Sequence, residues 1–410
     1  MKTSIEDLAV FGGVPSFSEP LHVGRPNIGN RDKLMQRINQ ILDCRWLTNN
    51  GTFVRQFEKQ ISEIVGAKHC IAMCNATIAL EIAIRASELT GEVIVPSMTF
   101  IATAHALQWQ EITPVFCDID PWTCNIDPKK IEQLITPRTT GIIGVHLWSR
   151  PCDIEDLSQI AQNHKLKLLF DAAHAFGCSY KGEMIGNFGN AEIFSFHATK
   201  FLNSGEGGAV ITNDDALAQK IRWMKNFGFE DYDLVVNIGT NGKMNEFSAA
   251  MGITSLESLN EIIEVNRQNY YCYLHEFLGM PGVTIAQFNE SEKCNYQYII
   301  LQFDPEITGV SRDEIKNILW AENVLARRYF YPGCHRMEPY RSHLQNAGLQ
   351  LPETERLAER VLALPTGTAL CQTEILEIAN IIRFVINNSS KINEKLNENN
   401  IQKQLTMVSS

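Results

Sequence analysis

Short apolar runs alternate with amphipathic helical patterns from about residue 30 to residue 230, and this alternation restricts the fold more than any other feature. The runs include HCIAM (69–73), EVIVP (92–96), TGIIGVHL (140–147) and LKLLFD (166–171). Because nearly continuous apolar strands separated by helices are buried on both faces, the pattern predicts a mostly parallel sheet covered by helices. Sheets of this kind bind ligands beyond the carboxyl ends of their strands.

The length of 410 residues suits one large domain and one smaller domain. A long helical pattern at 245–278 links the alternating region to a C-terminal part with a strand at 296–303 and further helices. We expect a large domain that includes the N-terminal segment, then a smaller C-terminal α+β domain, then a polar, disordered tail. The expected boundaries are 1–265, 266–387 and 388–410.

Composition and charge argue against several classes of protein. The formal net charge of −11 is unlike that of a nucleic-acid-binding protein, which normally carries a basic surface. An acidic chain can still bind a small anion, because a pocket needs only a few local cations. The sequence has no apolar run of membrane-spanning length, and its first residues lack the pattern of a signal peptide. We therefore expect a cytoplasmic protein that binds neither nucleic acid nor membrane.

Eleven cysteines could indicate a disulfide framework or a metal site. Their number is odd and their spacing is irregular, and neither Cys70 with Cys74 nor Cys117 with Cys124 has the spacing of a paired metal site. Reduced thiols, most of them buried, are the better interpretation, and we expect no metal.

One lysine, Lys200, stands where an apolar strand gives way to a loop of small residues. The strand is AEIFSF (191–196), and Ser204, Gly205 and Gly207 lie in the loop before the next apolar run. Small residues let a ligand or another backbone segment come close. Two interpretations are open from these residues alone, namely an ordinary surface lysine and a lysine at the edge of the core that forms an imine.

Other strand ends carry side chains suited to one flat, anionic ligand. Asn75 and Thr77 lie where a strand turns into a helix, whose free amides can bind phosphate, although both residues equally suit a simple cap. Asp171 ends a buried strand, where a carboxylate needs a cationic or hydrogen-bonding partner. His174 and Phe100 lie close to strand ends, and each could also be an ordinary core residue. With the loop lysine, these residues form the set that pyridoxal 5′-phosphate requires.

The chain resembles the sugar aminotransferases of the DegT/DnrJ/EryC1/StrS family over roughly residues 11–385. This resemblance implies the type I fold of pyridoxal-phosphate-dependent transferases, similar to aspartate aminotransferase. The segments that carry it occur in the same order as in the family and include WLTNNGTFVRQFE, CNATIALEIAI, EVIVPSMTFIATAHA, DAAHAFGCSYKG, GNAEIFSFHATK, GEGGAVITND and GTNGKMNEFSAAMG.

The resemblance implies roles for four residues around the cofactor ring. Lys200 would form the imine bond to the cofactor and move the proton. Asp171 would pair with the pyridine nitrogen, and His174 would lie beside the ring hydroxyl. Phe100 would stack on the ring.

The resemblance also implies how the phosphate is held. Thr77, the amide of Ile78, and Ser195 would bind it within one chain. Asn241 would reach it from a neighbouring subunit, so the active unit would be a homodimer with shared active sites. This chain departs from many relatives in having Asn75 and Ala76 where those relatives have Ser and Gly.

Three segments resemble most the family members that aminate C4 of dTDP-4-keto-6-deoxyglucose, namely GGVPSFSEPLHVGRPNIG, GTNGKMNE and YFYPGCHRMEPY. The expected reaction transfers the amino group of L-glutamate to C4 of that nucleotide sugar. Tyr331 and His335 would belong to the sugar pocket, although this segment is one residue longer than the usual family pattern. One alternative is an aminotransferase whose substrate is a 3-keto sugar nucleotide. A second alternative is a catalytically silent relative that acts as a binding or regulatory protein.

Overall fold

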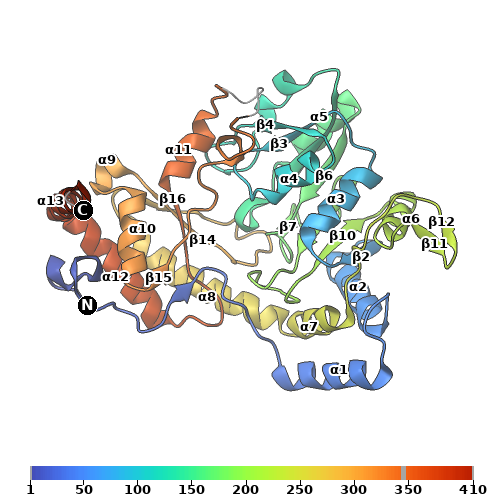
Figure 1. The fold of residues 1–410 in the computed structure, drawn as a ribbon, viewed down its shortest axis with the longest axis horizontal. Helices are drawn as coiled ribbons and strands as arrows, with labels where there is room; N and C mark the ends of the chain where they lie inside the picture. Colours follow the sequence, from blue (N-terminus) through green and yellow to red (C-terminus); the bar gives the residue numbers. More distant parts are fainter. Residues whose placement is uncertain (1, 343–347, 409–410) are drawn as a thin grey trace.

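The computed structural model describes residues 2–342 and 348–408 and is built around a seven-stranded sheet (Figure 1). The strand order is β2-β10-β9-β6-β5-β3-β4; β10 runs antiparallel to both neighbours and all other neighbours are parallel. The mostly parallel α/β sheet predicted from the sequence is thereby confirmed. The strands are β2 (His69–Met73), β3 (Glu92–Pro96), β4 (Thr113–Cys117), β5 (Thr139–Val145), β6 (Lys167–Asp171), β9 (Ala191–Ser195) and β10 (Gly208–Thr212).

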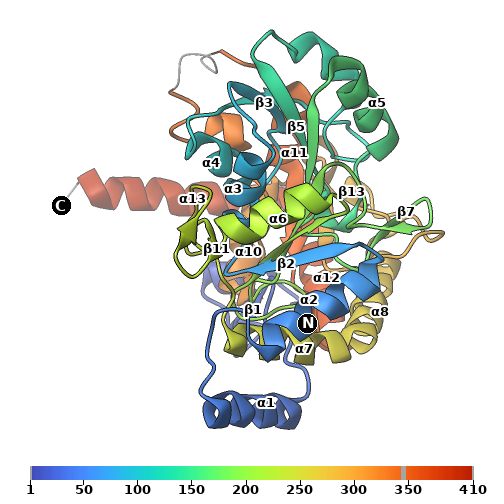
Figure 2. The ribbon, with the colours of Figure 1, turned by 90° about the vertical axis from the view of Figure 1, so that its right-hand side faces the viewer.

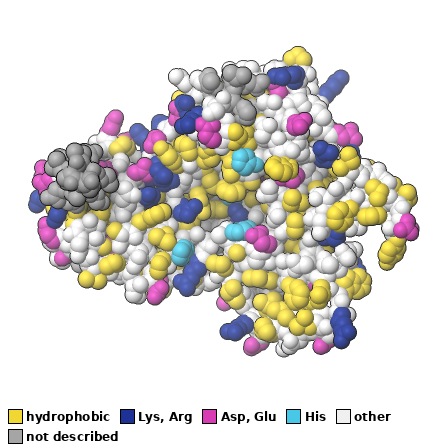
Figure 3. Space-filling model, in the orientation of Figure 1, with side chains coloured by type: hydrophobic (Ala, Val, Ile, Leu, Met, Phe, Trp, Pro, Cys, Tyr) yellow, Lys and Arg dark blue, Asp and Glu magenta, His cyan; other side chains and the backbone are white. Residues whose placement is uncertain are grey.

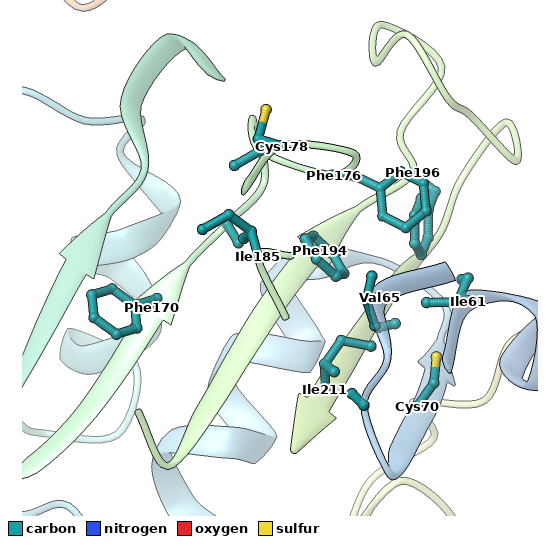
Figure 4. Packing of buried hydrophobic residues seen from close by; sticks show 14 of the residues in the cluster. Ile61, Val65, Cys70, Phe170, Phe176, Cys178, Ile185, Phe194, Phe196 and Ile211 are labelled. Atoms are coloured by element: carbon teal, nitrogen blue, oxygen red, sulfur yellow. The ribbon is translucent and has the colours of Figure 1, made fainter. Parts of the chain in front are cut away.

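Aromatic and aliphatic side chains fill the core on one face of this sheet (Figure 4). Phe176 packs edge-on against Phe194 of β9, with ring centroids 5.1 Å apart, and Phe57 packs edge-on against Phe196 at 5.2 Å. Burying each of these rings contributes roughly 1.5–3 kcal/mol to the free energy of unfolding. The helices α2 (Thr52–Val65), α5 (Ile154–His164) and α7 (Glu246–Glu257) cover this face. The helices α3 (Ala76–Ala86), α4 (Ala102–Gln108) and α6 (Asp215–Met224) cover the opposite face.

Capping side chains fix where several of these helices begin. Asn75, Asp153, Asp214 and Asn245 each accept a hydrogen bond from a backbone amide in the first turn of α3, α5, α6 or α7. Such a cap satisfies an amide that has no partner within the helix and stabilises it by about 1 kcal/mol. The cap on α3 matters most for function, because α3 begins at the ligand-binding edge of the sheet.

A second, smaller domain follows the long helix α8 (Leu259–Phe277), and the expected boundary at residue 265 falls inside that helix. Its antiparallel sheet has the order β13-β14-β16 and its own apolar core. The elements are β13 (Val283–Ile285), β14 (Ile299–Phe303), β16 (Val361–Leu364), α9 (Pro305–Thr308), α10 (Arg312–Ala321), α11 (Pro352–Arg360) and α12 (Gln372–Asn387).

The first part of the N-terminal segment packs on the second domain, although the whole segment was expected to belong to the large one, and Asn27 still exchanges hydrogen bonds with Phe201 and Asn203 of the large domain. Strand β1 (Leu21–His22) pairs in parallel with β15 (Val324–Leu325), and Phe17 is buried in the second core. The buried carboxylate of Glu322 accepts hydrogen bonds from two amides of the segment and pairs with Lys2 Nζ at 2.9 Å. The local sequence pattern does not predict these long-range contacts.

Residues 388–410 were expected to be disordered, but Ser389–Val408 form helix α13. Side chains near its start explain the order. Ile392 is buried in the second core, Asn393 donates to the carbonyl of Gly309 at 2.8 Å, and Lys395 pairs with Glu6 at 2.8 Å. Neither α13 nor any other helix in the described residues is long and apolar enough to cross a membrane.

Two elements with exposed apolar side chains project from the large domain. Helix α1 (Arg31–Cys44) lies at the lower edge of the molecule in both Figure 1 and Figure 2, and the hairpin of β11 (Phe229–Asp231) and β12 (Leu234–Val235) extends away from α6. Tyr232 at the hairpin tip is 94% exposed, and apolar side chains of α1 such as Met35 and Leu42 are also exposed. These faces have no partner within the described part of the chain.

Candidate active site

A cavity of about 340 Å³ lies at the carboxyl ends of the parallel strands, where the second domain closes over the sheet. Figure 3 shows a hollow in the middle of this face, with basic and histidine side chains around it. The large domain contributes Asn75, Thr77, Phe100, Asp171, His174, Ser195 and Lys200 to the cavity wall, and the second domain contributes Tyr298, Arg327, Tyr329 and Phe330.

Asp171 is the last residue of β6, and hydrogen bonds hold both of its carboxylate oxygens. The hydroxyl of Thr103 on α4 donates to Oδ2 at 2.8 Å, and the amide of Ala173 donates to Oδ1 at 3.1 Å. The hydroxyls of Thr99 and Thr103 lie 3.0 Å apart and extend this network. The carboxylate is therefore fixed in direction at the cavity wall.

Lys200 brings its amine to the same cavity from the loop after β9. Its Nζ donates to the hydroxyl of Tyr298 at 3.2 Å. Burial lowers the pKa of Lys200 to about 8, against an opposing effect from the negative charge of Asp171. A substantial share of the Lys200 amine is therefore neutral near physiological pH, whereas the amine of an ordinary surface lysine is almost entirely charged.

His174 lies behind Tyr298, with ring centroids 4.5 Å apart. Its Nδ1 accepts a hydrogen bond from the amide of Trp148 at 3.2 Å. Burial, together with the positive charge of Lys200, holds the pKa of His174 well below its usual range. The ring is therefore neutral, and because Nδ1 accepts, Nε2 carries the proton.

The start of α3 forms one end of the cavity. The Oδ1 atom of Asn75 accepts from the amide of Ile78 at 2.8 Å, and the contact of that amide with a phosphate stays a prediction. The side chain of Ser195, at the end of β9, lines the cavity. Gly208 lies against this turn so closely that a Cβ atom there would stand 2.5 Å from the nitrogen of Ala76.

Phe100 stands at the cavity mouth and is 56% exposed, an unusual exposure for a large aromatic side chain. Its ring centroid lies 6.0 Å from that of Phe330, which comes from the second domain. The exposed ring offers a flat apolar face to a ligand.

Residues 29–383 match the DegT/DnrJ/EryC1/StrS aminotransferase family. The chain belongs to this family. The aminotransferase is 37% identical to the dTDP-4-amino-4,6-dideoxy-D-glucose transaminase of Escherichia coli, over 88% of this chain and 97% of that protein. It is 32% identical to the GDP-perosamine synthase of Caulobacter vibrioides, over 87% of this chain and 95% of that protein.

A solved structure of DesI in the presence of its TDP-sugar product superposes on this aminotransferase with a TM-score of 0.92. The two chains are 47% identical, and the match covers 96% of this chain and 100% of that one. Both the family resemblance and the type I fold inferred from the sequence are thereby confirmed.

The structure does not bring the two expected sugar-pocket residues of the aminotransferase into the cavity. His335 is only 1% exposed and lies behind the wall, where its Nδ1 is 2.6 Å from Ser97 Oγ and its Nε2 is 3.1 Å from Glu355. Tyr331 faces a neighbouring hollow, and its ring packs against the guanidinium of Arg328 at 4.3 Å. Tyr329 and Phe330 of the same segment line the cavity instead.

Asn241 is not among the residues that line the cavity of its own chain, although the carbonyl of the next residue, Gly242, accepts a hydrogen bond from the amide of Cys74 just before α3. Asn241 is exposed and forms an isolated backbone bridge with Asn226, beside the projecting hairpin. The expected contact of Asn241 with the phosphate of a neighbouring subunit stays a prediction.

Sequence reasoning missed five residues of the site of this aminotransferase. Thr103, Tyr298 and Arg327 had no assigned role, and Tyr329 and Phe330 lie in the segment YFYPGCHRMEPY, of which only Tyr331 and His335 were assigned to the sugar pocket. The density of aromatic and basic residues in RRYFYP was the one available signal for three of them. The missed residues are Thr103, Tyr298, Arg327, Tyr329 and Phe330.

Proposed function

We propose that this aminotransferase uses pyridoxal 5′-phosphate to move the amino group of L-glutamate to C4 of dTDP-4-keto-6-deoxyglucose. The product would be dTDP-4-amino-4,6-dideoxyglucose with an equatorial amine. The observation that carries the proposal is one cavity that combines the amine of Lys200, with its lowered pKa, and the fixed carboxylate of Asp171. The names of the relatives support the substrate.

The donor set fits the cofactor. The carboxylate of Asp171 would pair with the protonated pyridine nitrogen, the exposed face of Phe100 would cover the ring, and His174 would lie near the ring hydroxyl. Thr77 and Ser195 would bind the phosphate at the start of α3, where free backbone amides favour an anion. A Cβ atom at position 208 would clash with Ala76. The absence of a side chain at Gly208 therefore leaves the proposed phosphate site undisturbed.

When bound, pyridoxal phosphate would supply a carrier for the amino group and an acceptor for electrons. Lys200 as a neutral amine takes the proton from the donor carbon, and as an ammonium it returns a proton to the sugar carbon. Tyr298 holds Nζ in place for both transfers, because a hydroxyl can accept from an ammonium and donate to an amine. Asp171 keeps the pyridine nitrogen protonated, which favours uptake of electrons by the ring.

The lowered pKa of Lys200 predicts a pH profile for the cofactor-free protein. The amine reacts only when neutral, so the rate of pyridoxal phosphate capture should rise with pH and level off above about pH 8. Asp171 raises that pKa, so Asp171→Asn should move the midpoint to lower pH. Stopped-flow absorbance of the apo-protein measures both profiles. A rate that still rises past pH 10 would show an ordinary exposed lysine and contradict the burial argument.

Product analysis tests the position of amination. The holoenzyme is incubated with L-glutamate and either the 4-keto or the 3-keto sugar nucleotide, and the product is examined by NMR. We expect an equatorial amine at C4 and little reaction of the 3-keto isomer, because a misplaced sugar leaves buried polar groups unpaired. An amine at C3, or activity on the 3-keto sugar alone, would promote the alternative function. A catalytically silent relative would show neither product.

A homodimer would explain the exposed apolar side chains of the projecting elements and the position of Asn241. The apolar faces of α1 and of the β11–β12 hairpin are exposed, and Asn241 lies beside that hairpin. Packing these faces against a second copy would bury them and could bring Asn241 to the phosphate in the neighbouring cavity. Light scattering should give a mass twice the 46.2 kDa of the chain, and a monomer that is fully active would contradict a shared site.

A further inference from the structure

The amide side chain of Asn295 makes hydrogen bonds through both of its donors and both lone pairs of its oxygen. Its Nδ2 donates to the carbonyls of His174 and Phe176 at 3.0 and 2.9 Å. Its Oδ1 accepts from the hydroxyl of Ser149 at 2.5 Å and from the backbone amide of Gln297 at 3.0 Å. Two donors and two lone pairs are all that an amide side chain has. The chemistry described so far gives this fully buried side chain no task.

These hydrogen bonds connect three segments that belong to two domains. Asn295 lies in the segment before β14 of the second domain, Ser149 in the loop after β5, and His174 in the loop after β6. The backbone carbonyl of Asn295 also accepts from the side chain of Asn266 on α8 at 3.0 Å, which ties the segment to the long helix. One side chain therefore joins a second-domain segment to the carboxyl-end loops of two neighbouring strands of the large sheet.

The ring of His174 depends on Asn295 through two routes. The first is the hydrogen bond to the backbone carbonyl of His174 itself. The second runs through Ser149, because the preceding residue, Trp148, supplies the amide that donates to His174 Nδ1. Trp148 and Ser149 have φ values of 51° and 66°, a left-handed backbone that persists only where surrounding contacts hold it. Asn295 thus fixes both the histidine and the amide that orients its ring.

The same side chain also holds the segment that reaches the lysine. The backbone amide of Gln297 donates to Asn295 Oδ1, and the side chain of Gln297 donates to the carbonyl of Thr199 at 3.3 Å. Thr199 directly precedes Lys200, and Tyr298, the residue after Gln297, accepts from Lys200 Nζ at 3.2 Å. Asn295 therefore lies at the base of both contacts between this segment and the lysine loop.

We propose that Asn295 is a positioning residue for amino transfer, whose amide sets the direction of the His174 ring and holds Tyr298 beside Lys200. The inference rests on the proposed function, because His174 and Lys200 have tasks only if the cavity receives the proposed cofactor. Asn295 is not among the described residues that line the cavity, so it acts through these neighbours. Displacing reacting groups by about 1 Å can slow a reaction roughly 100-fold even when the altered residue is distant from the chemistry.

NMR of the cofactor-free protein tests the effect on His174 directly. In protein labelled with ¹⁵N-histidine, the His174 ring should be a single neutral tautomer with its proton on Nε2, because Nδ1 accepts from an amide. Loss of its signals in His174→Gln identifies them. In Asn295→Ala the donor amide and the ring lose their shared support. A second tautomer, with the proton on Nδ1, should then appear.

A buried asparagine elsewhere in the second domain provides the matched control. Asn269 on α8 donates through Nδ2 to the carbonyl of Gly367 at 3.1 Å and is not among the described residues that line the cavity. Asn269→Ala should also lower the midpoint of thermal unfolding, but it should leave the His174 signals unchanged. If Asn295→Ala does not fold, Ser149→Ala takes its place, because it removes one of the four hydrogen bonds and should produce the same second tautomer.

Kinetics of the holoenzyme separate positioning from substrate binding. Asn295→Ala should lower kcat roughly tenfold, while KM for L-glutamate and for the sugar nucleotide changes less than twofold. An unchanged His174 signal, the same change in Asn269→Ala, an unchanged kcat, or a loss confined to KM would each overturn the proposal. The NMR experiment uses neither substrate. A second tautomer in a protein that does not aminate the 4-keto sugar therefore supports the hold of Asn295 on His174 and overturns only the sugar assignment.

Discussion

Replacing Lys200 with alanine should reduce amino transfer by roughly 10⁴-fold or more while the protein stays folded. Its Nζ is the proposed carrier of the proton and reaches the cavity with a lowered pKa and the hydroxyl of Tyr298 beside it. No other lysine lines the cavity wall described here, so no neighbour can take over the task. Steady-state kinetics with L-glutamate and the 4-keto sugar measure the loss.

Stability and chemical rescue supply the controls for this variant. Lys200 is half-buried in a loop, so its truncation should change the midpoint of thermal unfolding only slightly. A small primary amine added to the solution should restore part of the activity, because it can occupy the space left by the side chain. Borohydride reduction of the unaltered holoenzyme should leave the cofactor on the peptide that contains Lys200. Near-normal turnover by Lys200→Ala would remove Lys200 from the reaction.

Replacing Asp171 with asparagine should lower kcat by on the order of 100-fold, because the hydrogen-bonding shape is retained while the negative charge is lost. The Thr103 hydroxyl and the Ala173 amide both donate to this side chain, and an amide oxygen can accept from one of them. Without the charge, Asp171→Asn would favour the protonated pyridine nitrogen of the proposed cofactor less and would weaken the capacity of the ring to accept electrons. Turnover kinetics and the absorbance of the bound cofactor are the measurements.

Thr103→Val is the matched control for Asp171→Asn. It removes one hydrogen bond to the carboxylate but keeps the charge, so its loss of rate should be clearly smaller than that of Asp171→Asn. Asp171→Ala removes both charge and shape and should be the slowest of the three. If Asp171→Ala turned over almost normally, the carboxylate would serve only to cap the turn at Ala173.

Sequence patterns predicted the parts of the fold that depend on neighbouring residues. Continuous apolar strands specify the parallel sheet, and an acid at the end of one strand or a lysine after another is placed at the ligand-binding edge by that topology alone. Asp171 and Lys200 could therefore be identified before the fold was known. Phe100, Thr77 and Ser195 also line the cavity for the same reason.

Contacts between distant segments could not be predicted in this way. Burial of Phe17 in the second core and anchoring of Asn393 at Gly309 depend on elements hundreds or dozens of residues away. His335 lies in a segment that resembles a sugar-pocket motif, but Ser97 and Glu355 hold it behind the wall. A motif gives the residue type and the approximate location, whereas tertiary packing decides which side of the wall the side chain occupies.

The hydrogen bond from Lys200 to Tyr298 joins the two domains at the amine proposed to react. Tyr298 directly precedes β14, the middle strand of the small sheet, so its hydroxyl moves with that sheet. A slight rotation of the second domain would alter the distance between Nζ and the hydroxyl without disturbing any contact inside the large domain. Evolution, or a laboratory selection for rate, can therefore adjust the distance between the Lys200 amine and the Tyr298 hydroxyl through the packing of β14. Every substrate-binding residue can stay the same.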